Sequence, residues 1–141
     1  HYRQALALFV EFNDRYSQAS TYHQLGIVAQ EQRRWEEAES HYRQALALFV
    51  EFNDRYSQGS TYNQLGALAS AQELWSQAAE NYLQAVGIAV EFQDEYRLGT
   101  RLQSLGRVWQ ASGDGTIPVR VGALLGVSAG EAGRLLGGDN E

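Results

Sequence analysis

Histidine is the first residue type to consider for chemistry, because it binds metals and carries protons near neutral pH. The chain has three, His1, His23 and His41. His1 and His41 are equivalent positions of an internal repeat, and Asn81 takes that position in the next copy. No pair has the H-x-x-x-H or H-E-x-x-H spacing that brings two imidazoles to one zinc ion. The sequence therefore predicts no metal site.

The other groups that could take part in catalysis are also placed unfavourably. Glu36, Glu37 and Glu39 lie in the first turn or two of a predicted helix, where carboxylates favour the positive end of the helix dipole, so we interpret them as a solvated helix start. Serine is common, but no convincing base accompanies one. No G-x-G-x-x-G or P-loop sequence is present to bind phosphates. We predict no catalytic residue, no cofactor-binding residue, no cofactor and no enzyme activity.

The composition points the same way. The 141 residues include 11 basic and 17 acidic side chains, a formal net charge of −6, which disfavours binding to a phosphate backbone. All the basic residues are arginines, so a lysine Schiff base is excluded. Cysteine is absent, which excludes disulfides, thiolate zinc sites and iron–sulfur clusters. No apolar run is long enough to span a membrane. We expect a cytoplasmic protein with no nucleic-acid or membrane partner, and, because the chain starts without Met, part of a longer one.

A repeat of 40 residues organises the chain. Residues 1–18 recur unchanged at 41–58, and a diverged third copy starts at residue 81. Each period has apolar or small residues at steps of three and four, which predicts two amphipathic helices. We expect Asn13 or Asp14 to cap the first of these. The following helices are expected at Trp35–Glu51, Asp54–Ala71, Trp75–Glu91 and Asp94–Ala111.

These residues resemble the tetratricopeptide repeat, whose pattern is an aromatic residue, Leu-Gly, and later Ala, aromatic, Ala. The matching residues are Tyr22, Leu25, Gly26, Trp35, Ala38, Tyr42 and Ala45, then Tyr62, Leu65, Gly66, Trp75, Ala78, Tyr82 and Ala85, then Leu105, Gly106 and Trp109. A 40-residue period also suits HEAT and armadillo repeats, but the Leu-Gly and Ala-x-x-x-Tyr-x-x-Ala spacings recur in register and favour the tetratricopeptide repeat. The usual 34-residue unit is exceeded, as in the extended type found in bacterial signalling ATPases and regulators.

The resemblance implies an all-α fold, a right-handed superhelical solenoid of antiparallel helix pairs with a short two-helix C-terminal cap. It implies these divisions: a repeat array over 1–112, made of a half unit 1–12, units 13–52 and 53–92 and a partial unit 93–112, followed by a cap over 113–136 and a disordered tail over 137–141.

The resemblance also implies that the chain is a protein–protein interaction scaffold in a larger bacterial signalling protein. The first helix of each unit would line a concave face that binds a peptide or a partner domain. By position, that face comprises Ser20, His23, Gln24, Ile27 and Gln30, then Ser60, Asn63, Gln64, Ala67 and Ser70, then Thr100, Gln103, Arg107 and Gln110. The alternative is that these polar residues only solvate the inner face. The two-carboxylate clamp of chaperone-binding members is not matched.

The N-terminal end suggests a second role. Tyr2, Ala5, Leu6 and Phe9 would belong to a second helix whose own first helix is missing, so we expect an uncovered apolar end. Such an end predicts a homo-oligomer, or a frayed helix. The alternative function is therefore a self-assembly module that stacks through its open N-terminal end.

The C-terminal sequence predicts two short helices, one from Ile117 to Leu125 and one begun by Ser128 with Glu131 as a capping box. We expect Val119, Leu124, Leu125, Leu135 and Leu136 to face inward. The segment 121–136 is also similar to a helix-turn-helix, but its second helix lacks polar side chains for base edges, and residues 116–141 carry only two arginines against three acidic residues. We therefore interpret it as a structural cap.

Overall fold

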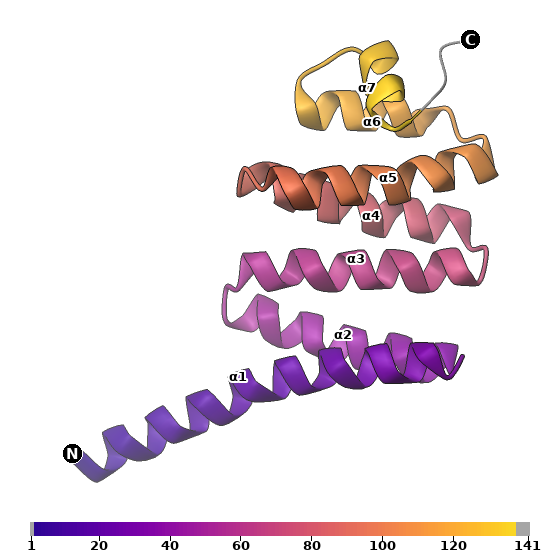
Figure 1. The fold of residues 1–141 in the computed structure, drawn as a ribbon. Coiled ribbons are helices and arrows are strands. Elements are labelled where there is room, and N and C mark those ends of the chain that lie inside the picture. The colour runs from indigo at the N-terminus through magenta and orange to yellow at the C-terminus, as the bar shows by residue number, and fades with distance from the viewer. Residues whose placement is uncertain (1, 138–141) are drawn as a thin grey trace. The chain divides into compact units, whose positions relative to one another are not determined.

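The computed structural model describes residues 2–137, except for the side chains of residues 2, 3, 5, 6, 9 and 10. These residues form seven helices and no strand (Figure 1). The helices are α1 (Tyr2–Glu31), α2 (Trp35–Glu51), α3 (Arg55–Ala71), α4 (Trp75–Glu91), α5 (Glu95–Ser112), α6 (Thr116–Leu125) and α7 (Ala129–Leu135). The chain divides into two compact units, an N-terminal unit (His1–Thr61) and a C-terminal unit (Tyr62–Glu141).

Four tight turns join the first five helices. In each turn one non-glycine residue has a positive φ, and these residues are twenty positions apart: Arg33 (φ 61°), Asn53 (φ 56°), Glu73 (φ 59°) and Gln93 (φ 53°). The next N–H donates to a carbonyl five residues back, as from Asp54 to Phe49 at 2.8 Å and from Leu74 to Ala69 at 2.9 Å. This is the Schellman ending of a helix, which satisfies the last carbonyls. The 40-residue period is therefore twice a helix-and-turn unit.

The helix starts agree closely with the predicted ones. Asp54 and Asp94 cap α3 and α5, since their carboxylates accept hydrogen bonds from the backbone N–H groups of Ser57 (3.0 Å) and Arg97 (3.1 Å). The starts of α2 at Trp35 and of α4 at Trp75 were predicted to the residue.

The predicted helix start, capped by Asn13 or Asp14, is wrong. Both residues lie inside α1, which runs for 30 residues, so 2–12 is not a separate helix. The identical residues at 52–54 do form a turn. There the chain folds back and α3 packs on α2. Thr61 of α3 is fully buried, and Gln58 donates from Nε2 to the Phe49 carbonyl of α2 at 3.4 Å. A left-handed residue costs about 1 kcal/mol, so without such contacts the helix continues.

A glycine–tyrosine contact holds α1 to α2 in the N-terminal unit. A Cβ placed on Gly26 would lie 2.5 Å from the ring of Tyr42, which is completely buried. The Tyr42 hydroxyl donates to Gln30 Oε1 at 2.7 Å. An ion pair also joins the two helices, between Arg15 of α1 and Glu51 of α2 at 2.8 Å. Residues early in α1 therefore lie beside residues late in α2.

The C-terminal unit repeats this contact and adds the cap. A Cβ on Gly66 would lie 2.7 Å from the Tyr82 ring. The core is the cluster formed by Ala69, Ala78, Ala79, Tyr82, Leu83, Val86, Leu102, Leu105, Val108, Ile117, Val121, Ala132 and Leu136. Arg120 of α6 pairs with both carboxylate oxygens of Glu80 on α4. Helices α6 and α7 therefore pack on the helices of their own unit.

The prediction of which side chains face inward in the cap is only partly correct. Leu136 is buried and Leu125 is partly buried against the core, but Val119, Leu124 and Leu135 are exposed. Small residues take their place: Gly122 and Ala132 are buried, and Gly133 lies against Trp109. The Ser128 cap was predicted correctly, with its hydroxyl accepting from the Glu131 N–H at 3.1 Å. Of the predicted tail 137–141, residues 138–141 lie outside the described residues.

Adding one methyl group at Gly26 should test the glycine–tyrosine contact. We expect Gly26→Ala to lower the free energy of unfolding by about 1–3 kcal/mol, because the new carbon would overlap the Tyr42 ring. The control is Gly99→Ala in α5, where a Cβ meets nothing within 4 Å and the substitution should stabilise by about 0.5–1 kcal/mol. Urea denaturation of both variants measures the difference. Equal effects would show that the contact is not a steric constraint.

Candidate functional site

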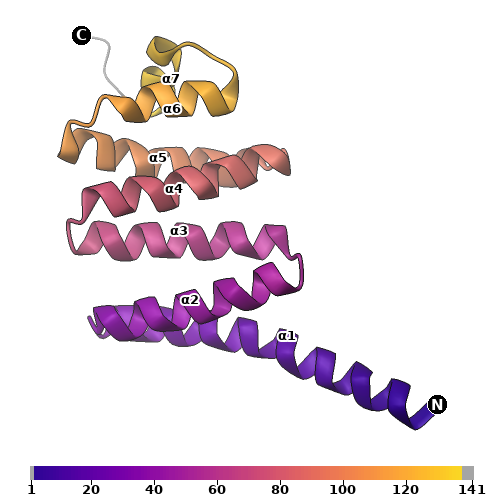
Figure 2. The ribbon, with the colours of Figure 1, turned by 180° about the vertical axis from the view of Figure 1, so that it is seen from behind.

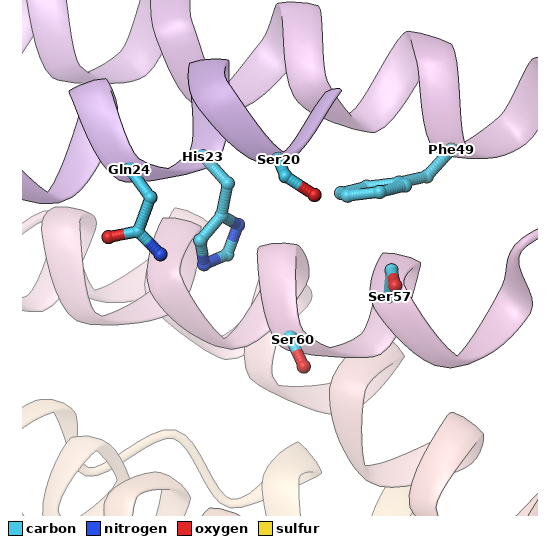
Figure 3. A pocket seen from close by; sticks show the side chains of 6 residues that line it. All are labelled: Ser20, His23, Gln24, Phe49, Ser57 and Ser60. Atoms are coloured by element: carbon cyan, nitrogen blue, oxygen red, sulfur yellow. The ribbon is translucent and has the colours of Figure 1, made fainter. Parts of the chain in front are cut away.

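A small pocket lies in the N-terminal unit, where α1, α2 and α3 meet. Its volume is about 170 Å³. Figure 3 shows side chains from all three helices around it. They are Ser20, His23 and Gln24 of α1, Phe49 of α2, and Ser57 and Ser60 of α3. Four of the six, Ser20, His23, Gln24 and Ser60, were among the predicted concave-face residues, so the structure brings part of that set together.

His23 is fixed in orientation by α3. Its Nδ1 lies 3.2 Å from the Thr61 hydroxyl oxygen, and that hydroxyl donates to the Ser57 carbonyl at 3.1 Å. Because the single proton of Thr61 is used in that bond, Nδ1 must donate to Thr61 and Nε2 remains an acceptor. Burial of the ring lowers the pKa of His23, so the neutral form is favoured. The imidazole can therefore accept a hydrogen bond from a bound molecule at neutral pH.

An anion lies behind the pocket wall. The Ser57 hydroxyl donates to the Asp54 carboxylate at 2.7 Å, and the Tyr16 hydroxyl donates to the same carboxylate. Burial alone would raise the pKa of Asp54, but these two bonds and the one from the Ser57 N–H outweigh it, and the pKa is lowered. The carboxylate is therefore charged at neutral pH and biases the site against anions.

The remaining predicted residues behave differently. In the N-terminal unit, Gln30 binds the Tyr42 hydroxyl and so serves the packing, while Ile27 is half-buried. In the C-terminal unit, Thr100, Gln103, Arg107 and Gln110 are exposed, and Asn63, Gln64, Ala67 and Ser70 are half-buried. Asn63 Oδ1 is buried and has no hydrogen-bond partner within the described part of the chain.

The sequence pattern did not indicate two of the lining residues, Phe49 and Ser57. Both were overlooked because the concave face was assigned to the middle of each first helix. Phe49 comes from a second helix, α2, and Ser57 lies in the first turn of α3. The clustering of Ser57 and Ser60 one helical turn apart was the available signal.

One serine, Ser128, has a sequence context that occurs around catalytic serines. Ser128 lies in a Gly-x-Ser-x-Gly sequence, Gly126–Gly130, which in some hydrolases presents a nucleophile. Here it follows helix α6, and its hydroxyl caps α7 instead. No group of three or more metal-ligating side chains is found among residues 2–137, and no helix described there is long and apolar enough to cross a membrane.

Comparison with protein families identifies the repeat. The sequence model of the tetratricopeptide repeat family matches residues 1–49 and 17–91. The second match alone covers more than half of the chain. The chain belongs to the tetratricopeptide repeat family. No curated protein and no solved structure gives a match.

Membership explains the packing described above. In this tetratricopeptide chain the family's Gly and aromatic positions are Gly26 with Tyr42 and Gly66 with Tyr82, which are in contact in the structure. Tetratricopeptide repeats generally mediate protein–protein interactions and are typically not enzymes. The predicted N-terminal self-association residues, Tyr2, Ala5, Leu6 and Phe9, have side chains outside the described part of the structure.

His23 should make stability depend on pH. Its pKa is lowered in the folded chain, so above its unfolded value near 6.5 its contribution is complete. As the pH falls through that value, the unfolded chain takes up the proton first and stability is lost until the folded pKa is reached. We expect His23→Asn, the residue that α3 carries as Asn63, to unfold with a weaker pH dependence between pH 7.5 and 5. Parallel wild-type and variant curves would contradict the assignment.

Proposed function

We propose that this chain is a non-enzymatic interaction scaffold that binds a peptide segment of a partner protein along α1 and α3 of the N-terminal unit. The observation that carries the proposal is the pocket at Phe49, where side chains from three helices converge. Family membership supports the general role, and the pocket supports this location.

The size of the pocket favours one side chain over a whole ligand. Sites for small molecules and cofactors usually enclose about 300–1,000 Å³, and this pocket holds about 170 Å³. A single apolar side chain of a peptide, packed against the Phe49 ring, suits that volume. The rest of the peptide would extend from the pocket past Gln24 of α1.

The polar groups around the pocket suit a peptide backbone. Ser20, Ser60 and Gln24 can both donate and accept hydrogen bonds, and His23 Nε2 accepts. None of the six lining residues carries a charge at neutral pH when His23 is neutral. With Asp54 behind the wall and a net charge of −6, we expect a neutral or basic peptide and not an acidic tail.

The wider setting extends the same proposal. We propose that the helix pairs are units of a right-handed superhelix, and that the chain acts in the cytoplasm as part of a larger bacterial sensor or regulator. The extended repeat length of 40 residues supports this setting. A self-assembly role is the second candidate, and the exposed face of α1 favours it.

A pair of substitutions on α1 tests the pocket. Peptides selected from a random displayed library would be measured by fluorescence anisotropy against the wild type, Ser20→Arg and Ser17→Arg. Ser20 lines the pocket and Ser17 is exposed on the same helix without lining it. We expect Ser20→Arg to weaken binding at least about tenfold, or 1.4 kcal/mol, and Ser17→Arg to have little effect. Equal affinities for both variants, or no selected peptide, would contradict the proposed site.

A further inference from the structure

One face of α1 is exposed although the same face of α3 is buried. The two helices are equivalent positions of the repeat, 40 residues apart. Leu25 and Val28 are 43% and 47% exposed, whereas Leu65 and Leu68 are each 2% exposed. Gln18 and Thr21 are exposed as well, whereas Gln58 and Thr61 are buried. These four residues, Gln18, Thr21, Leu25 and Val28, form the open face of α1.

The open face is a single stripe. Its residues are three, four and three positions apart, which places them on one side of an α-helix. The stripe mixes two polar and two large apolar residues. The equivalent stripe of α3, Gln58, Thr61, Leu65 and Leu68, is buried, so the open face is a surface on which a helix can pack.

The repeat itself indicates which helix fits. In the N-terminal unit, α3 begins immediately after α2, and Gln58 donates to the Phe49 carbonyl of α2. The residues 42–52 that precede the turn are identical to residues 2–12. A helix with the sequence 2–12 therefore has the side chains that meet this type of face.

The chain cannot place its own residues 2–12 on its own open face. They continue α1 as one unbroken helix, and in both views the N-terminal half of α1 runs on past α2 (Figures 1 and 2). A 30-residue helix is about 45 Å long, so residues 2–12 point away from residues 18–28 of the same molecule. Leu8 and Phe12 in that segment are 65% and 53% exposed, although Leu48 packs in the core of the unit.

We propose that two copies of this chain pair through α1, with residues 2–12 of each copy covering the open face of the other. The two α1 helices run in opposite directions about a two-fold axis near Asn13 and Asp14. Each copy supplies the helix that the other lacks, which is an exchange of identical elements, and the straightened segment 12–14 is the hinge.

The charges near the two-fold axis predict how the affinity of the dimer depends on salt. Glu11 and Asp14 continue the stripe of the open face toward the axis, because they lie seven and four positions before Gln18. Pairing brings the carboxylates of two copies near each other there. Salt screens such repulsion, so the dimer should become tighter as salt is added.

The first test measures mass against concentration by size-exclusion chromatography with light scattering. We expect a dimer that dissociates on dilution. Val28→Glu should weaken it at least about tenfold, while Val119→Glu, an exposed valine of α6 outside the open face, should not. Circular dichroism checks that both variants keep their helices. A monomer at all concentrations, or equal effects of the two substitutions, would overturn the proposal.

The second test addresses the hinge. Asn13→Ala favours the continuous helix and should tighten the dimer, whereas Asn13→Gly favours a turn and should weaken it roughly fivefold or more, since two hinges are affected. Asn53→Gly is the matched control, because the same residue there already has a positive φ. It should leave the dimer unchanged. A dimer that is indifferent to both Asn13 substitutions is not exchanged, and this would overturn the proposal whatever the outcome for peptide binding.

Discussion

The contact between a bare glycine and a tyrosine ring sets the distance between paired helices, and the site depends on that distance. Gly26 has no Cβ, so the ring of Tyr42 lies directly on the backbone of α1 and its hydroxyl reaches Gln30. Burial raises the pKa of Tyr42 to about 12, so the hydroxyl stays protonated and can donate. With α2 held so close, the His23 ring meets the Tyr42 ring at 5.7 Å between centroids, and Phe49 can reach the pocket between α1 and α3.

The two copies of the sequence Phe-Asn-Asp show that a turn here is a property of packing as well as of local sequence. At 52–54 the asparagine adopts a left-handed conformation and the aspartate caps the next helix, whereas at 12–14 the same residues are helical. Asparagine tolerates the left-handed conformation better than most residues, yet it does not enforce it. What differs is the burial of the helix that follows, since Gln58 and Thr61 are buried and Gln18 and Thr21 are not. When a helical hairpin forms only if the following helix is buried, the same segment can instead stay extended and pack on another molecule.

The sequence predicted what periodicity and capping decide, and failed where tertiary contacts decide. Trp35, Trp75, Asp54 and Asp94 marked helix starts correctly, because caps and the 3.6-residue period act locally. In the cap, the large residues Val119 and Leu135 were expected inside, yet small ones are buried, because α7 approaches α5 so closely that a Cβ on Gly106 would overlap the Leu136 carbonyl. Close approach selects against size, and hydrophobicity alone does not reveal it. Phe49 was missed at the pocket for a related reason, since a buried residue of the core also lines the pocket.

The divergence of the third copy makes the candidate pocket of the N-terminal unit different from the equivalent position one repeat later. An array of identical repeats would offer the same pocket at every register, and a peptide could slide between registers. Here the residues 40 positions after Phe49, Ser57 and Thr61 are Ala89, Arg97 and Arg101. The aromatic wall is thus lost in the next register, and a buried arginine, which donates to the Ala85 carbonyl at 2.8 Å, replaces the threonine that orients His23. Since the first two copies are nearly identical, these substitutions are what distinguish one register from the next. A peptide of the kind proposed, which needs the aromatic wall and the neutral imidazole, would therefore fit the first register and not the next.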